Sequence, residues 1–258
     1  MFIKQADFYQ LMNPDATCPE SQFTIDQAVE KGISDYRDLD GDGYLDIDPH
    51  HELSDNFKYK ELIASDNAKA FGLENRVPAN RTDIILNAEY TAKNLLEPCR
   101  TQFGGFTPNS WYRGPEVEFA ATHRDGFSKY MAKTYRRTSN SEPTLDVLTS
   151  RVQASNLLRT IVSDAKSGNK NAGIILHLWN NYFNSKQHPN GEAVDFEIKG
   201  SNGNKALWDW IKKSSLKYDQ LILEFHNPSA GAFSGWVHGS VVDEARTGKK
   251  NRMSAFTI

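Results

Sequence analysis

The segment 185–196 constrains the fold more than any other part of the chain, and it reads Ser-Lys-Gln-His-Pro-Asn-Gly-Glu-Ala-Val-Asp-Phe. His188 and Asp195 are seven positions apart. This spacing does not suit neighbours on one helical face, which lie three or four positions apart. Gly191 permits a tight turn between them, and the residues around Asp195 favour a strand. We therefore expect the imidazole and the carboxylate to meet across a turn and a strand.

A second short segment, 235–238, reads Gly-Trp-Val-His and adds another imidazole. Two imidazoles and one carboxylate form a ligand set typical of a catalytic zinc site with an open position for water. The sequence therefore predicts a zinc site held by His188, Asp195 and His238. Nitrogen and oxygen ligands alone leave other transition metals open, and a structural histidine beside a turn is the simpler alternative.

These segments resemble the zinc D-Ala-D-Ala carboxypeptidase family of LAS metallopeptidases, which includes phage and bacterial murein peptidases. The family signature is Ser-x-His-x-x-Gly-x-Ala-x-Asp, and Lys186 stands here in place of its Ser. Other similar segments follow in the family's order, at 56–62, 65–69, 73–75, 94–100, 109–113, 220–225 and 235–238.

The resemblance implies an α+β fold in which helices pack on a small antiparallel sheet that carries the metal. We expect a zinc peptidase domain over 53–258, a helical insertion at about 118–180 and a separate N-terminal module over 1–52. Apolar periodicity predicts helices at 25–33, 83–99, 145–158 and 206–211. A proline near the end of the second of these helices is expected to limit its continuation.

A zinc peptidase needs a base to activate water, and Glu224 is the candidate. It ends the apolar run 221–223, where burial can raise the pKa of a carboxyl toward a useful range. Other family members place a catalytic Glu three residues before the last His, a position that Gly235 occupies here. His226 is a second candidate, for stabilising the transition state. An ordinary strand-end salt bridge is the alternative role for Glu224.

Three further residues are candidates for contacts with substrate. Arg113 ends a Ser-Trp-Tyr-Arg turn that is similar to the family's arginine-bearing turn. A guanidinium binds a peptide carboxylate bidentately or stabilises a tetrahedral oxyanion, although a surface arginine is the alternative. Gln187 is the polar neighbour of His188, and Trp236 is expected to line the cleft unless it belongs to the core.

The acidic segment 38–48 resembles the first nine positions of a calcium loop. Hard oxygen ligands at alternate positions wrap a cation, and a glycine at position 6 supplies the sharp turn. The expected ligands are Asp38, Asp40, Asp42, the carbonyl of Tyr44, and Asp46. Pro49 replaces the usual bidentate Glu at position 12. The alternative is a solvated acidic turn, and bound calcium could be structural or regulatory.

Charge and terminal sequence limit the partners and the location. A formal charge of −3 gives no general electrostatic reason to expect nucleic acid. Residues 1–7 lack the apolar core of a signal peptide, and no apolar run approaches the ~20 residues that cross a bilayer. Cys18 and Cys99 are expected to be reduced thiols. We therefore expect synthesis in the cytoplasm of a phage-infected host, without membrane insertion.

The leading expectation is a peptidoglycan peptidase that hydrolyses an amide bond in the peptide stem. A phage endolysin would reach the cell wall through a holin, and a virion-associated lysin would arrive with other virion proteins. An endopeptidase is favoured over a D-Ala-D-Ala carboxypeptidase because lysis requires cutting load-carrying links. Two alternatives remain: a structural tail or baseplate protein with a degenerate or subsidiary peptidase domain, and a calcium-dependent wall-binding protein.

Overall fold

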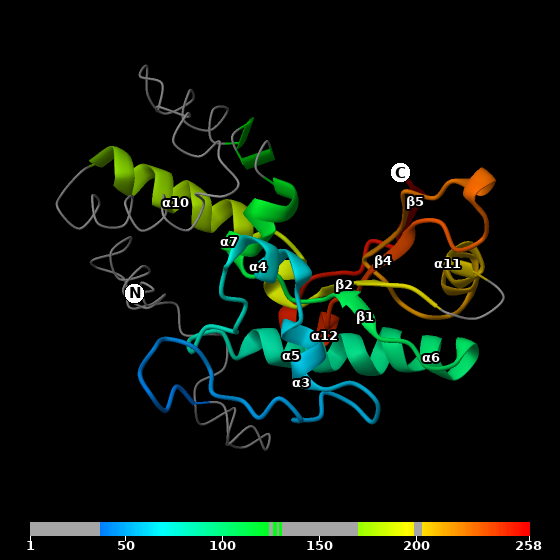
Figure 1. The fold of residues 1–258 in the computed structure, drawn as a ribbon, viewed down its shortest axis with the longest axis horizontal. Coiled ribbons are helices and arrows are strands. Elements are labelled where there is room, and N and C mark those ends of the chain that lie inside the picture. The colour runs from blue at the N-terminus through cyan, green and yellow to red at the C-terminus, as the bar shows by residue number, and fades with distance from the viewer. Residues whose placement is uncertain (1–36, 124–125, 128, 131–169, 199–202) are drawn as a thin grey trace. The chain divides into compact units, whose positions relative to one another are not determined.

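The computed structural model describes residues 37–258 except 124–125, 128, 131–169 and 199–202 (Figure 1). The chain forms two compact units, and each unit is assembled from three separate segments. One unit comprises Met1–Ile47, Asp66–Asp83 and Arg113–Pro189, and the other comprises Asp48–Ser65, Ile84–Tyr112 and Asn190–Ile258. The predicted helices at 25–33 and 145–158 lie outside the described residues.

A 5-stranded sheet with the order β1-β2-β4-β3-β5 is the centre of the second unit. Its strands are β1 (Pro108–Ser110), β2 (Ala193–Phe196), β3 (Gln220–Glu224), β4 (Trp236–Ser240) and β5 (Ser254–Thr257). The first four strands pair antiparallel, but β5 runs parallel to β3. The prediction of an α+β fold is confirmed, whereas the prediction of a wholly antiparallel sheet is wrong because the last strand joins an edge in the parallel direction.

The sheet has two faces, because successive side chains of a strand point to opposite sides. The pairing of the strands shows which residues share a face. One face belongs to the core and includes Phe196, Leu223 and Val237, which are fully buried. On that face, a Cβ at Gly239 would lie 2.8 Å from the Leu95 side chain. The opposite face carries a row that crosses all five strands and consists of Ser110, Asp195, His238, Ile222 and Phe256.

Helix α11 (Gly203–Lys213) packs against β3 and β4. Its buried Trp208 donates a hydrogen bond of 3.2 Å from Nε1 to the Leu221 carbonyl. The helix is longer than the predicted span 206–211. The sheet is thereby fixed to a helix by apolar burial and by a directed hydrogen bond.

The predicted helix at 83–99 is confirmed and extends further. It consists of α5 (Asp83–Thr91), a π-helical turn η1 (Ala92–Leu96) and α6 (Glu97–Phe103), which follow one another along the chain (Figure 1). The expectation that Pro98 limits the helix is wrong. Pro98 follows the π-helical turn η1, and Leu96 and Glu97 before it keep helical backbone angles, so the helix continues through the proline. Gly104, with φ of 87°, ends the helix.

The first unit is described through α4 (Asp66–Phe71), α7 (Pro115–Glu118), the π-helical turn η2 (Phe119–His123) and α10 (Lys170–Asn184). Within the predicted insertion at 118–180, the described residues include η2 and the first part of α10, which are both helical. Its core is aromatic: the ring centroids of Trp179 and Phe183 are 4.5 Å apart, and those of Phe119 and Trp179 are 5.0 Å apart.

The remaining short elements are α3 (Tyr59–Ile63), the 3-10 turns η4 (His188–Asn190) and η5 (Pro228–Ala230), and α12 (Glu244–Thr247). Among the described residues, no helix combines the length and the apolar character that crossing a membrane requires.

Candidate metal centre

The register of two neighbouring strands brings Asp195 and His238 together. Asp195 on β2 lies directly opposite His238 on β4, so both side chains point to the same face of the sheet. Nδ1 of His238 is 2.9 Å from Oδ1 of Asp195. Both residues are buried, which shields the pair from bulk water and strengthens the electrostatic attraction between its members.

A tight turn connects His188, the first residue of η4, to the strand that carries Asp195. Gly191 in this turn has φ of +68°, and an added Cβ would lie 2.7 Å from the Ile84 carbonyl oxygen. Asn87 donates a hydrogen bond of 2.7 Å to the Asn190 carbonyl. The turn therefore depends on a glycine and is anchored to α5, as the sequence argument for Gly191 predicts.

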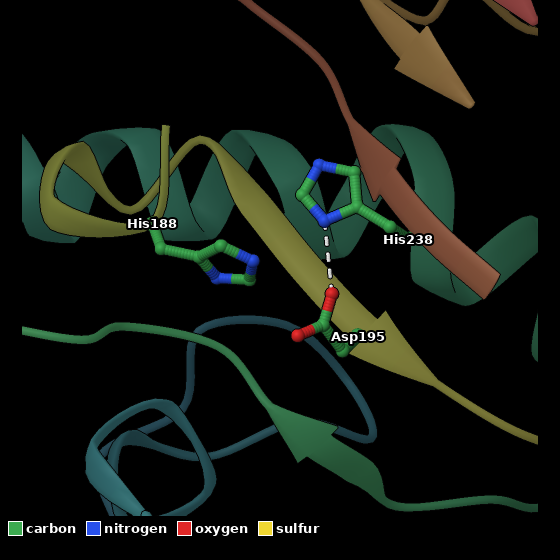
Figure 2. Close-up of side chains that lie close together, drawn as sticks. All are labelled: His188, Asp195 and His238. Carbon is green, nitrogen blue, oxygen red and sulfur yellow. Dashed lines mark hydrogen bonds and ion pairs between the residues drawn. The ribbon is translucent and has the colours of Figure 1, made fainter. Parts of the chain in front are cut away.

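The three predicted ligands form one cluster. His188, Asp195 and His238 are all buried, and each offers a ligand atom within 4.8 Å of the others. Figure 2 shows the three side chains gathered together, with the dashed hydrogen bond between Asp195 and His238. Two imidazole nitrogens and one carboxylate oxygen that converge in this way fit a transition metal with tetrahedral preference. The grouping of these residues confirms that they could hold a metal ion.

The turn between the ligands also contains a buried carboxylate that pairs with an exposed lysine. Glu192 is 3 % exposed, and its Oε1 lies 2.7 Å from Nζ of Lys249. Burial raises the pKa of the Glu192 carboxyl, and the nearby Lys249 ammonium opposes that effect only in part. This ion pair ties the ligand-bearing turn to the segment that follows α12.

Strand register places Glu224 on the same face as the metal-ligand pair. Glu224 lies opposite Trp236, two residues before His238 on β4, and side chains two apart on a strand share a face. Gly235, which holds the position of the family's catalytic Glu, has no side chain that could act as a base, and its φ is +71°. A Cβ there would lie 2.0 Å from the Glu224 carbonyl oxygen. Among the two positions, only Glu224 can offer a carboxylate.

Arg113 belongs to a buried ion pair that the sequence did not predict. Its Nε lies 2.6 Å from Oε2 of Glu118, and the two side chains are 10 % and 2 % exposed. Lys186, which replaces the signature Ser, places its ammonium 4.4 Å from the ring centre of Tyr182. Burial lowers the pKa of Lys186, while the Glu118 carboxylate acts in the opposite direction. Glu118 thus influences both cationic residues.

His226 and Gln187 occupy positions outside the three-residue cluster. His226 lies in the loop between β3 and β4, where its Nδ1 is 3.1 Å from the Ser234 hydroxyl and 3.2 Å from the Ser234 carbonyl. These contacts give His226 a role in fixing the loop. Gln187 is half-buried immediately before His188.

The acidic loop is folded around its own carboxylates. Asp38 accepts hydrogen bonds from the N–H groups of Gly41 and Gly43, at 2.6 Å and 2.9 Å. Asp38, Asp40 and Asp42 offer carboxylate oxygens within 4.8 Å of one another. These contacts bring the first three predicted calcium ligands together.

Backbone pairing turns the Tyr44 carbonyl away from the 77–79 segment. Leu45 donates to the Val77 carbonyl and Ala79 donates to the Gly43 carbonyl, both at 2.9 Å. Tyr44 lies between these bonds, so its own N–H and carbonyl point away from the 77–79 segment. Its N–H accordingly donates to Asp42 Oδ1 at 2.9 Å. Burial, followed by nearby carboxylates, raises the pKa of the Tyr44 hydroxyl to about 12.

A guanidinium competes for two of the predicted calcium ligands. The terminal nitrogens of Arg76 lie 2.5 Å from Asp42 Oδ2 and 2.8 Å from Asp46 Oδ1. Arg76 therefore supplies an internal positive charge to the loop. The sequence pattern gave no sign of this contact, because the partners are separated by 34 and 30 positions.

Comparison with models of protein families, with curated proteins and with solved structures finds no match for this chain. The resemblance to zinc murein peptidases therefore rests on the motifs alone. The convergence of His188, Asp195 and His238 is observed independently of that resemblance.

Proposed function

We propose that this chain is a zinc-dependent peptidase that hydrolyses an amide bond in the peptide stem of peptidoglycan. The observation that carries the proposal is the buried convergence of His188, Asp195 and His238 within 4.8 Å. Two imidazoles, one carboxylate and an open fourth position are the ligand pattern of a catalytic zinc site. The murein substrate rests on the motif resemblance.

Zinc bound at this cluster supplies Lewis acidity for polarising the scissile carbonyl and for activating water. His188, Asp195 and His238 would hold the ion. Glu224, on the same sheet face as His238, would accept the proton of the attacking water and deliver it to the leaving amine. Arg113, held by Glu118 at 2.6 Å, would bind a substrate carboxylate or the developing oxyanion. His226 is the second candidate for transition-state stabilisation.

Calcium at the acidic loop is the second part of the proposal. The clustered carboxylates of Asp38, Asp40 and Asp42 support it, and so does the Tyr44 carbonyl, which is not used in pairing with the 77–79 segment. Asp46 would complete the set only after release from Arg76. We propose a structural role, because the loop is joined to the 77–79 segment by backbone hydrogen bonds.

The test is to incubate zinc-loaded protein with purified murein and to identify the released fragments by mass spectrometry. We expect new amino termini within the stem peptide or at a cross-link, which indicates an endopeptidase. Release of a single terminal D-Ala would indicate a carboxypeptidase. A chelator should abolish cleavage, and readdition of zinc should restore it. Failure of fully zinc-loaded protein to cleave any stem-peptide bond would refute the proposed activity.

A further inference from the structure

Two hydrogen-bonding atoms on the sheet are buried without a partner. The Ser110 hydroxyl and the Trp236 indole Nε1 are inaccessible to solvent and make no hydrogen bond to any described residue. Buried polar groups are nearly always paired with protein or an ordered molecule. The Trp208 indole follows this rule, since its Nε1 donates to the Leu221 carbonyl. The two unpaired groups therefore require an explanation.

Both groups are next to the metal-ligand pair. Ser110 lies opposite Asp195, on the side away from His238, because the strand order is β1-β2-β4. Trp236 is two residues before His238 on β4 and faces Glu224 on β3. Strand alternation places Trp236 on the face that carries the metal-ligand pair. Ser110 and Trp236 thus flank the Asp195–His238 pair from two different directions.

The ring of Trp236 is held in place by its surroundings. Phe225 has φ of 53°, which ends the regular alternation of β3, and its ring centroid is 4.9 Å from that of Trp236. Asn204 fixes the adjoining turn by donating a hydrogen bond of 2.8 Å to the Gly235 carbonyl. The orientation of the indole is therefore supported by the fold before any ligand binds.

The chemistry of these groups limits the kind of atom that can pair with them. An indole Nε1 can only donate, and a serine hydroxyl can donate or accept. The partner of Trp236 must therefore offer an acceptor atom, and oxygen is the acceptor that peptides provide. A peptide carbonyl or carboxylate oxygen meets that requirement at both positions.

We propose that Ser110 and Trp236 are substrate-binding residues that donate hydrogen bonds to peptide oxygens on either side of the scissile amide. This inference rests on the proposed peptidase function and deepens it. It specifies a peptide ligand that places carbonyl or carboxylate oxygens on both sides of the metal centre. A substrate that contacts only the metal centre would leave the Ser110 hydroxyl and the Trp236 indole unpaired.

The experiment uses the full chain, loaded with zinc, and the free murein tetrapeptide L-Ala-γ-D-Glu-diaminopimelate-D-Ala as the binding probe. The variants are Ser110→Ala and Trp236→Phe, with Trp208→Phe as the matched control. Binding is followed by the ¹H–¹⁵N signals of the indole groups, and Trp236→Phe identifies the signal of interest. Murein cleavage supplies KM and kcat in parallel.

We expect the tetrapeptide to shift the Trp236 indole signal downfield. Each test variant should raise KM or the dissociation constant about three- to tenfold, the usual worth of one hydrogen bond. Ser110→Ala should leave the thermal midpoint unchanged, because it removes a hydroxyl that has no partner among the described residues. Trp208→Phe should lower the thermal midpoint and leave KM unchanged, because its indole is already paired.

Unchanged binding and KM in both test variants, in an enzyme that cleaves murein, would overturn the inference and leave the proposed function intact. If the wild type cleaves no murein but the tetrapeptide still shifts the Trp236 signal, the binding site stands and the peptidase function fails. If neither cleavage nor a shift occurs, both fail.

Discussion

Nδ1 of His238 lies 2.9 Å from Oδ1 of Asp195, and the two residues are direct neighbours across β2 and β4 (Figure 2). The ladder of backbone hydrogen bonds between the strands fixes their separation. Two of the three proposed metal ligands therefore need no rearrangement of the backbone to meet. The third, His188, is supplied by the glycine-dependent turn that precedes β2.

This arrangement predicts one zinc per chain. Removing a residue that only hydrogen-bonds to a metal ligand already lowers metal affinity about 10- to 100-fold. Because His188→Ala removes a ligand itself, it should weaken zinc binding by more than about 100-fold. The control is His177→Ala, because His177 is an exposed residue of α10. Zinc content after equilibration with a competing chelator measures the effect. Full zinc occupancy in His188→Ala would show that the ligand assignment is wrong.

The turn before β4 predicts a strong requirement for glycine. A Cβ at Gly235 would lie 2.0 Å from the Glu224 carbonyl oxygen, whereas a Cβ at Gly248 meets nothing within 4 Å. Both glycines have positive φ, of +71° and +69°. Gly248→Ala should therefore cost only the left-handed strain, about 1–2 kcal/mol. Gly235→Ala should cost more in denaturant unfolding, and equal losses would contradict the close approach.

Local spacing, together with the resemblance to the motifs of zinc murein peptidases, was sufficient to predict the ligand cluster. His188, Gly191 and Asp195 lie within one short segment, where turn and strand preferences act over a few residues. His238 was recognisable because Trp-Val-His favours a strand. The grouping of the three ligands is confirmed, while the identity of the metal stays a prediction.

The remaining features depend on contacts between distant segments. The parallel pairing of β5 depends on which edge of the sheet remains available, and Ser254–Thr257 has no pattern that specifies direction. The Arg113–Glu118 pair and the Arg76 contacts also carry no periodic signal. The sequence showed Ser110 only as part of a motif. That its hydroxyl is buried without a partner among the described residues could be seen only in the folded structure.

Calcium affinity should respond to Arg76. This guanidinium neutralises Asp42 and Asp46, and calcium must displace it to use both carboxylates. Arg76→Gln should therefore raise calcium affinity about two- to tenfold, since partly exposed ion pairs contribute modestly. Arg81→Gln is the matched control because Arg81 pairs with Asp83 instead. Calorimetry that detects no calcium binding to either the wild type or Arg76→Gln would refute the calcium site.

Acid stability should depend on Glu97. Burial would raise the pKa of its carboxyl, but hydrogen bonds from Ser54 and from the side chain and N–H of Asn56 outweigh burial and lower it. A lowered folded pKa means that the stabilisation is present above about pH 4.5 and disappears as the pH falls through the folded value.

Glu97→Gln should therefore lose about 1–2 kcal/mol near pH 7 and show a smaller difference from the wild type at low pH. Denaturant unfolding across pH 3–7 measures both effects. A constant difference between the two proteins over that range would exclude the proposed linkage.

The rate of murein cleavage by zinc-loaded Glu224→Gln tests the central claim most directly, with Glu89→Gln on α5 as the control for the same chemical change. Glutamine keeps the volume of Glu224 but cannot accept the proton of water. We predict unchanged zinc content, a similar thermal midpoint and a rate lower by at least about 100-fold, the lower end of the usual contribution of acid–base catalysis. The control should cleave at the wild-type rate. Equal cleavage by Glu224→Gln and the wild type would contradict the assignment of the base, and a fully zinc-loaded wild type that releases no murein fragment would contradict the peptidase account itself.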